Sequence, residues 1–305
     1  MTVLASDLAE IGMADAVRQL KEGRKALDAV EEGIRRVEAD PAVRHVGLGG
    51  DPNLLGEMEC DAAVMDGATR MAGSVGALRG HVHAVSVARA VMEHLPHVML
   101  VGEGAAMFAR EMGHRRTELL TDAARSSHGA WIERDVETSA GPNWRAGPLA
   151  PAAWIAAGRL ECRDTVVVLA IDARGDIAAG TSTSGWAYKY PGRLGDSPVI
   201  GAGLYAQNAA GACGCTHTGE MALRACTAAR VVWNLGAGVP VKDACAEAAA
   251  DLAGLTGGHL GGVVIHALSA SGAPAVVPAG RLRKPIAYWF WQEDMPAPEL
   301  REASG

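Results

Sequence analysis

The residue that could do chemistry in this sequence is a threonine at the start of an apolar strand. Thr165 follows Asp164 and precedes residues 166–171, a nearly continuous apolar run that predicts a strand buried on both faces. A threonine hydroxyl is a weak nucleophile at neutral pH and needs an adjacent base. A free α-amino group titrates at about 7.7–8.0, so a threonine at a chain N-terminus carries nucleophile and base in one residue. Thr165 gains such an amine only if the Asp164–Thr165 bond is cut.

Three polar segments follow this threonine in an otherwise apolar region. Residues 181–185 are rich in hydroxyls and end the second strand of a predicted β-hairpin. Residues 192–198 place an arginine and an aspartate between glycines, and residues 211–220 combine glycines with threonines ahead of a predicted helix. A few polar groups set in an apolar sheet are typical of a binding pocket.

Taken singly, these residues have ordinary structural explanations. About one Asp-Thr dipeptide is expected by chance in a chain of this length. Arg193 and Asp196 could form a solvated loop salt bridge, and Thr183 and Thr216 could be ordinary strand residues. Their joint order and spacing favour a site.

The ordered set resembles the glycosylasparaginases, which are N-terminal-nucleophile hydrolases of β-aspartyl amides. The resemblance covers nearly the whole chain and is carried by residues 23–31, 46–50, 86–92, 96–102, 164–165, 181–185, 192–198, 201–205 and 210–212. It implies an α+β fold, a four-layer αββα sandwich. It also implies one domain, residues 1–305, that cleaves itself into an α chain of residues 1–164 and a β chain of residues 165–305.

The resemblance implies a role for each matching residue in catalysis. Thr165 would be the nucleophile, released by an N→O acyl shift in which Asp164 assists. Thr183 would form a hydrogen bond with the nucleophile, and the Thr216 hydroxyl would stabilise the oxyanion.

The resemblance also implies how the substrate is held. Arg193 would clamp its α-carboxylate, a geometry that the planar guanidinium fork suits. Asp196 would pair with its α-amino group, and Gly219 would lie beside both. The expected partner is a small-molecule amide, with no metal and no cofactor. The expected assembly is a homo-oligomer, a dimer of processed αβ units.

Three positions depart from the family pattern. Asp7 stands where the family has a tryptophan that packs on the substrate. His217 replaces a glycine whose backbone N–H is the second oxyanion donor; its N–H could still serve, and its imidazole either lines the pocket or is incidental. Arg163 replaces the usual histidine before the scissile aspartate. We therefore expect a β-aspartyl amide with a different leaving group, such as one carrying an amine that Asp7 could pair.

Two other readings remain open beside the self-processing amidohydrolase. One is an isoaspartyl dipeptidase or L-asparaginase. The other is a non-catalytic binding protein on the same scaffold, which the changes at Asp7 and His217 would permit. The intact set of functional residues argues against a binding protein: Thr165, Thr183, Arg193, Asp196 and Thr216.

Composition is that of an ordinary soluble protein. The 305 residues are 49% apolar and 21% charged, with a net charge of −7, which argues against a nucleic-acid-coating surface. No signal peptide and no stretch long enough to cross a bilayer is present, so we expect a cytoplasmic protein with reduced thiols. The six cysteines form no Cys-x-x-Cys pair and show no zinc-like spacing with histidines.

Apolar periodicity predicts clustered runs of helices and strands. Helices are expected over residues 13–20, 26–37, 85–95, 118–132, 221–233 and 241–252, with another ending at residue 111. Hairpins are expected from residues 62–67 with 72–77 and from residues 261–268 with 275–277, and residues 286–291 should add an edge strand. A Gly-x-Gly at residues 102–104 lacks the third glycine of a dinucleotide fold. Residues 134–151 read as an exposed, mobile loop suited to a processing site.

Overall fold

The chain forms two stacked β-sheets in a computed structural model that describes residues 1–159, 165–282 and 285–303. Asp164 and Arg163, expected at the scissile bond, lie outside the described residues. The larger sheet has the strand order β12 (Glu299–Glu302), β11 (Ala287–Gln292), β1 (Thr2–Ser6), β5 (Val166–Ile171), β6 (Ile177–Thr183), β2 (Cys60–Asp66), β3 (Ala72–Leu78) and β4 (Met99–Val101). The smaller sheet has the order β10 (Pro274–Gly280), β9 (Gly262–Ser269), β8 (Gly211–His217) and β7 (Leu204–Gln207).

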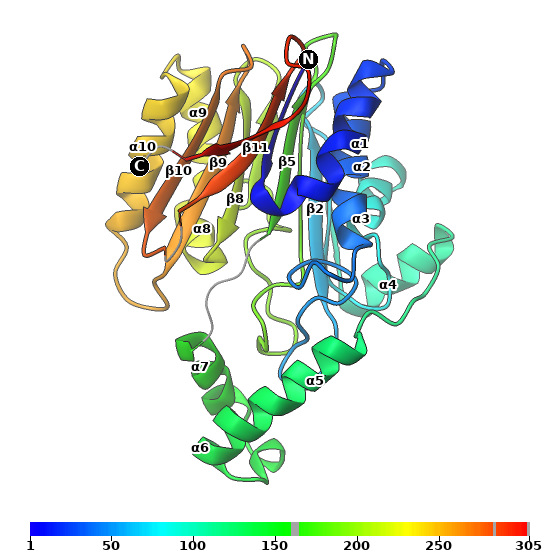
Figure 1. Ribbon diagram of the computed structural model, residues 1–305, viewed down its shortest axis with the longest axis vertical. Coiled ribbons are helices and arrows are strands. Elements are labelled where there is room, and N and C mark those ends of the chain that lie inside the picture. Colours follow the sequence, from blue (N-terminus) through cyan, green and yellow to red (C-terminus); the bar gives the residue numbers. More distant parts are fainter. Residues whose placement is uncertain (160–164, 283–284, 304–305) are drawn as a thin grey trace.

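Helices cover the outer face of each sheet, as Figure 1 shows. The larger sheet carries α1 (Glu10–Lys21), α2 (Ala26–Glu38), α3 (Ala84–His94) and α4 (Gly102–Glu111). The smaller sheet carries α8 (Gly219–Ala225), α9 (Thr227–Gly236) and α10 (Val241–Ala253). The predicted four-layer αββα sandwich is therefore confirmed, with a third apolar cluster between the two sheets.

Strand β5 is buried on both faces, as its apolar run predicted. Val166 and Val168 pack with the helices on the outer face. Val167 and Leu169 point the other way, into the layer between the sheets. Alternate side chains of a strand face opposite sides, so a strand covered on both sides must be apolar throughout.

The strand expected at residues 286–291 is present, but the expectation that it lies at an edge of the sheet is wrong. Strand β11 pairs antiparallel with β1 on one side and with β12 on the other. Trp291 is consequently fully buried. The edge is the short, charged β12, a composition typical of edge strands, and its polar sequence gave no sign of pairing.

The expectation that residues 134–151 form a loop is wrong, although most of these residues are exposed as expected. The region follows α5 (Asp122–Trp131) and is mostly helical, with η2 (Ile132–Glu137), α6 (Thr138–Ala140), η3 (Trp144–Ala146) and the start of α7 (Ala150–Arg159). Trp131 stacks on Tyr188 with ring centroids 4.3 Å apart, and Val136 and Trp144 are buried in the same cluster. These contacts reach a loop distant in sequence, so local composition could not reveal them. In Figure 1 these helices extend below the sandwich.

The helix expected over residues 221–233 is interrupted. Cys226 has a left-handed backbone with φ of 49°, so α8 ends there and α9 begins at Thr227. The sequence offers no glycine or proline at this point, and periodicity runs through it. The break leaves α8 as a short helix whose first turn faces the polar end of the sandwich described below.

Candidate active site

Thr165 lies at the end of the sheet where three of the polar segments meet. Strand β5 pairs with β6 in a register that sets Val166 against Ser182, so Thr165 comes opposite Thr183. The side chain of Thr165 is 4% exposed. The hairpin predicted from sequence thus brings the hydroxyl-rich segment beside the candidate nucleophile.

The smaller sheet comes close to this end of β5 because of one glycine. A Cβ atom at Gly214 would lie 2.5 Å from Cγ1 of Val167, a clash that only glycine avoids. Val167 is two residues after Thr165, and Gly214 is two residues before Thr216. The close approach therefore places Thr165 and Thr216 at the same end of the two sheets.

The hydroxyl and carbonyl of Thr165 are both hydrogen-bonded. Thr165 Oγ1 lies 3.2 Å from Ser197 Oγ. Ser6 Oγ donates to the Thr165 carbonyl at 3.3 Å and accepts from the Val167 N–H at 3.0 Å. Ser6 and Ser197 therefore fix the candidate nucleophile from two sides, and a rigid nucleophile is what an attack on a bound carbonyl requires.

Ser197, and not Thr183, is the hydroxyl partner of Thr165 in this structure. The Thr183 hydroxyl accepts from the Gly185 N–H at 2.9 Å and reaches the His45 carbonyl at 3.5 Å. Ser197 is positioned by its own carbonyl, which accepts from the Thr181 hydroxyl at 2.7 Å. Sequence reasoning missed Ser197, although it directly follows Asp196 in the same motif.

The oxyanion side of the site has an unusual backbone. Thr216 is buried, and its Oγ1 lies 2.8 Å from Nδ1 of His217. His217 has φ of 81°, a conformation that favours glycine and costs a residue with a side chain about 1–3 kcal/mol. The position thus has a backbone that glycine adopts freely while carrying a histidine.

Replacing Thr216 with valine is expected to lower kcat by about 10²–10³-fold, the usual effect of losing one oxyanion donor. His217→Gly keeps the backbone N–H and suits the left-handed backbone, so its kcat should stay within about threefold of wild type. Steady-state kinetics on the two variants checks both expectations. A large fall in the kcat of His217→Gly would instead show that the imidazole takes part in catalysis.

Arg193 is held by an ion pair and a ring. Its Nε and Nη2 donate to both carboxylate oxygens of Glu220 at 2.8–3.0 Å. The guanidinium carbon lies 4.5 Å from the centre of the Trp186 ring, which in turn meets His259 edge-on at 4.7 Å. Sequence reasoning missed Glu220, whose pairing depends on the fold of α8.

Asp196 is buried, with one carboxylate oxygen unused. The residue is only 3% exposed, and its Oδ2 makes no hydrogen bond among the described residues. A Cβ atom at Gly219 would lie 2.7 Å from Asp196 Oδ1, so the absence of a side chain there keeps the carboxylate in place. An unused buried carboxylate oxygen beside a guanidinium suits a substrate that carries an ammonium group.

Burial raises the pKa of Asp196 to about 7, against the opposing charge of Arg193 and with a further upward push from Glu220. The ionised carboxylate is the form that pairs with an ammonium group. Binding of L-aspartate, the expected product, should therefore weaken progressively as the pH falls below about 7. Calorimetric titration from pH 5 to 9 measures this, and Asp196→Asn should bind weakly at every pH.

Asp7 lies at the rim of the site. It opens a short helical turn, η1 (Asp7–Ala9), directly after Ser6, which contacts Thr165. Its side chain is exposed, and Oδ1 accepts from the Leu8 N–H at 2.9 Å. This position is compatible with the expected contact to a leaving group, which stays a prediction.

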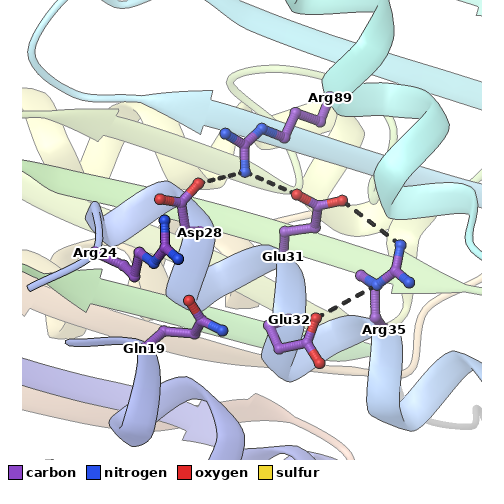
Figure 2. A pocket seen from close by; sticks show the side chains of 7 residues that line it. All are labelled: Gln19, Arg24, Asp28, Glu31, Glu32, Arg35 and Arg89. Atoms are coloured by element: carbon purple, nitrogen blue, oxygen red, sulfur yellow. Dashed lines mark hydrogen bonds and ion pairs between the residues drawn. The ribbon is translucent and has the colours of Figure 1, made fainter. Parts of the chain in front are cut away.

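A second charged pocket, between α1, α2 and α3, is not a comparable site. It has a volume of about 300 Å³, and Figure 2 shows its acidic and basic side chains turned toward one another. Arg89 Nη1 lies 2.7 Å from Asp28 and 2.8 Å from Glu31. Its charges neutralise each other, and no hydroxyl or thiol side chain lines it.

Among the described residues, no group of three or more His, Cys, Asp or Glu side chains is arranged to hold a metal ion. No helix in the same residues is both long and apolar enough to cross a membrane.

Comparisons with known proteins point to one family. A family model described as asparaginase matches residues 5–282. The chain is 40% identical over 234 residues to an N(4)-(β-N-acetylglucosaminyl)-L-asparaginase of Elizabethkingia miricola, covering 77% of this chain and 64% of that protein. It is 37% identical over 243 residues to the protein of the same name in Rattus norvegicus, covering 74% of this chain and 69% of that protein. The chain thus spans about two thirds of the length of these two relatives, 64% of one and 69% of the other.

Proposed function

The chain belongs to the asparaginase family, and from this premise we propose that it is a self-processing amidohydrolase. Its substrate is the side-chain amide of an asparagine-like, β-aspartyl compound. The observation that carries the proposal is Thr165, buried at the start of β5 with its hydroxyl 3.2 Å from Ser197 and beside the Arg193 and Asp196 segment.

The first step is cleavage of the chain at its own Asp164–Thr165 bond. The Thr165 hydroxyl attacks the Asp164 carbonyl carbon, the peptide nitrogen leaves with a proton, and an ester links the two residues. Water then hydrolyses the ester, which leaves a carboxylate on Asp164 and a free amine and hydroxyl on Thr165. The hydrogen bond from Ser6 to the Thr165 carbonyl supports this step, because it anchors Thr165 while its nitrogen is released.

Amide hydrolysis then uses the new N-terminus. The α-amine of Thr165 accepts the proton of its own hydroxyl, and Oγ1 attacks the side-chain carbonyl of the substrate. The Thr216 hydroxyl and the His217 N–H stabilise the oxyanion, and the leaving amine takes a proton. Water then hydrolyses the β-aspartyl ester, which releases the acid and regenerates Thr165.

Arg193 and Asp196 define the part of the substrate that does not react. Arg193 binds the α-carboxylate, and Asp196, whose Oδ1 lies beside Gly219 and whose Oδ2 is unused among the described residues, binds the α-ammonium group. The name of the relatives favours an N4-substituted asparagine. Asp7, exposed at the rim in place of a tryptophan, supports a leaving group other than the sugar amide of those proteins.

A panel of amides on the processed protein separates the alternatives. The proposal expects hydrolysis of N4-substituted asparagines, with aspartate as the common product. Ammonia released from asparagine with higher kcat/KM than any substituted amide indicates an L-asparaginase. Preference for β-aspartyl dipeptides indicates an isoaspartyl dipeptidase. Binding of aspartate without turnover of any amide contradicts the proposal and leaves a binding protein.

A further inference from the structure

The guanidinium of Arg193 is restrained along one edge and over one face before any substrate arrives. Glu220 takes the edge formed by Nε and Nη2 through three contacts of 2.8–3.0 Å. Trp186 covers one face at 4.5 Å. The Arg193 side chain is only 15% exposed, so these contacts are largely shielded from water. Paired and stacked in this way, the guanidinium has little freedom to turn.

The remaining end of the guanidinium, at Nη1, lies beside two glycines. Among the described residues Nη1 makes no hydrogen bond, since Nε and Nη2 carry all those of Arg193. A Cβ atom would lie 3.0 Å from Nη1 at Gly195 and 3.4 Å from it at Gly185. The two glycines thus leave room for this end, and Gly195 is followed directly by Asp196 with its unused Oδ2.

We propose that Glu220 and Trp186 are positioning residues that turn the Nη1 end of Arg193 toward the substrate. The α-carboxylate of the substrate then binds end-on, while Glu220 keeps its pair with Nε and Nη2. This inference rests on the proposed function and specifies how that site recognises its substrate.

The retained glutamate determines which substrates fit the charge of the site. With Asp196 ionised, Arg193, Glu220 and Asp196 together carry one net negative charge. Lys189, on the other side of Gly185, is balanced by Asp61 at 3.7 Å. Arg193 is already balanced by Glu220, so the charge left over is that of Asp196. A substrate ammonium group balances it, whereas an N-acylated analogue leaves Asp196 unpaired.

Glu220→Gln in the processed protein tests the proposal. The variant keeps the shape of the side chain and removes its charge, so KM for the best amide should rise by about tenfold while kcat stays within about twofold. Because the Glu220 charge raises the pKa of Asp196, the loss of aspartate binding at low pH should also move to lower pH. The split between KM and kcat is the readout that a merely structural glutamate would not give, because a loss of packing would lower kcat as well.

Two further variants and one control complete the test. Trp186→Leu should raise KM as Glu220→Gln does, and Trp186→Phe, which restores an aromatic face, should recover most of the loss. Glu299→Gln breaks a similar exposed pair with Arg301 on β12 and should change neither KM nor the pH profile.

The outcomes are distinct. A lower KM in Glu220→Gln would mean that the glutamate competes with the substrate and is displaced, which overturns the proposal. An unchanged KM with an unchanged pH profile also overturns it. If the wild-type protein is active, either result removes this inference alone. A processed wild type that hydrolyses no amide removes the proposed function and this inference with it.

Discussion

Replacing Thr165 with valine is expected to leave the chain as one piece of 305 residues and to abolish amide hydrolysis, a loss on the order of 10⁴-fold or more. Valine keeps the β-branched shape, so β5 should still pack. It removes the oxygen that attacks the peptide bond in processing and the amide carbonyl in turnover. Intact mass and an amide assay on the same sample measure both effects.

Two control variants distinguish loss of the nucleophile from loss of folding. Thr165→Ser keeps a hydroxyl and should still be processed. Thr227→Val makes the same substitution at a fully buried threonine of α9 whose Oγ1 has no hydrogen-bond partner among the described residues, and should leave activity unchanged. Cleavage of Thr165→Val at the same bond would contradict the assignment of the nucleophile.

Replacing Arg193 with lysine is expected to be the second largest change. The guanidinium of Arg193 pairs with Glu220 through Nε and Nη2 and leaves Nη1 for a substrate. The single ammonium group of a lysine cannot make both contacts in this geometry. The pair is partly buried, and the fork would also be lost to the substrate carboxylate, so kcat/KM should fall by roughly 10²–10³-fold.

The loss in Arg193→Lys should fall mainly on KM, because the arginine contacts the α-carboxylate and not the reacting carbonyl. Processing should persist, since it needs no substrate carboxylate. Arg301→Lys, at the exposed pair on β12, is the control. An Arg193→Lys variant that keeps wild-type KM would place the carboxylate site elsewhere.

The layers of the fold follow from the sequence because their signals are local. The unbroken apolar run of β5 predicted a strand covered on both faces, and that is where it lies. The loop predicted for residues 134–151 was wrong. Trp144 is buried there in a cluster that also contains Ala187 and Tyr188, from a loop far along the chain. Local polarity describes the exposed side of such a segment and says nothing of its buried contacts.

In the candidate site, too, some residues could be predicted from the sequence and others could not. The family resemblance, carried by the order of the motifs, is what predicted that Thr165, Arg193 and Asp196 share a site, and the Thr165 hydroxyl does lie 3.2 Å from that of Ser197, the residue after Asp196. Ser6 and Glu220 escaped notice, because each acts only through a contact made by the folded chain: Ser6 reaches Thr165 across neighbouring strands, and Glu220 reaches Arg193 from the first turn of α8. Residues that hold others in place carry no motif of their own.

Intact mass and N-terminal sequencing of the purified wild-type protein test the central claim most directly. The account predicts two fragments of 164 and 141 residues, which together make up the 305 of the chain, and a second N-terminal sequence that reads Thr-Val-Val-Val. A single uncut chain that nevertheless hydrolyses β-aspartyl amides would contradict it.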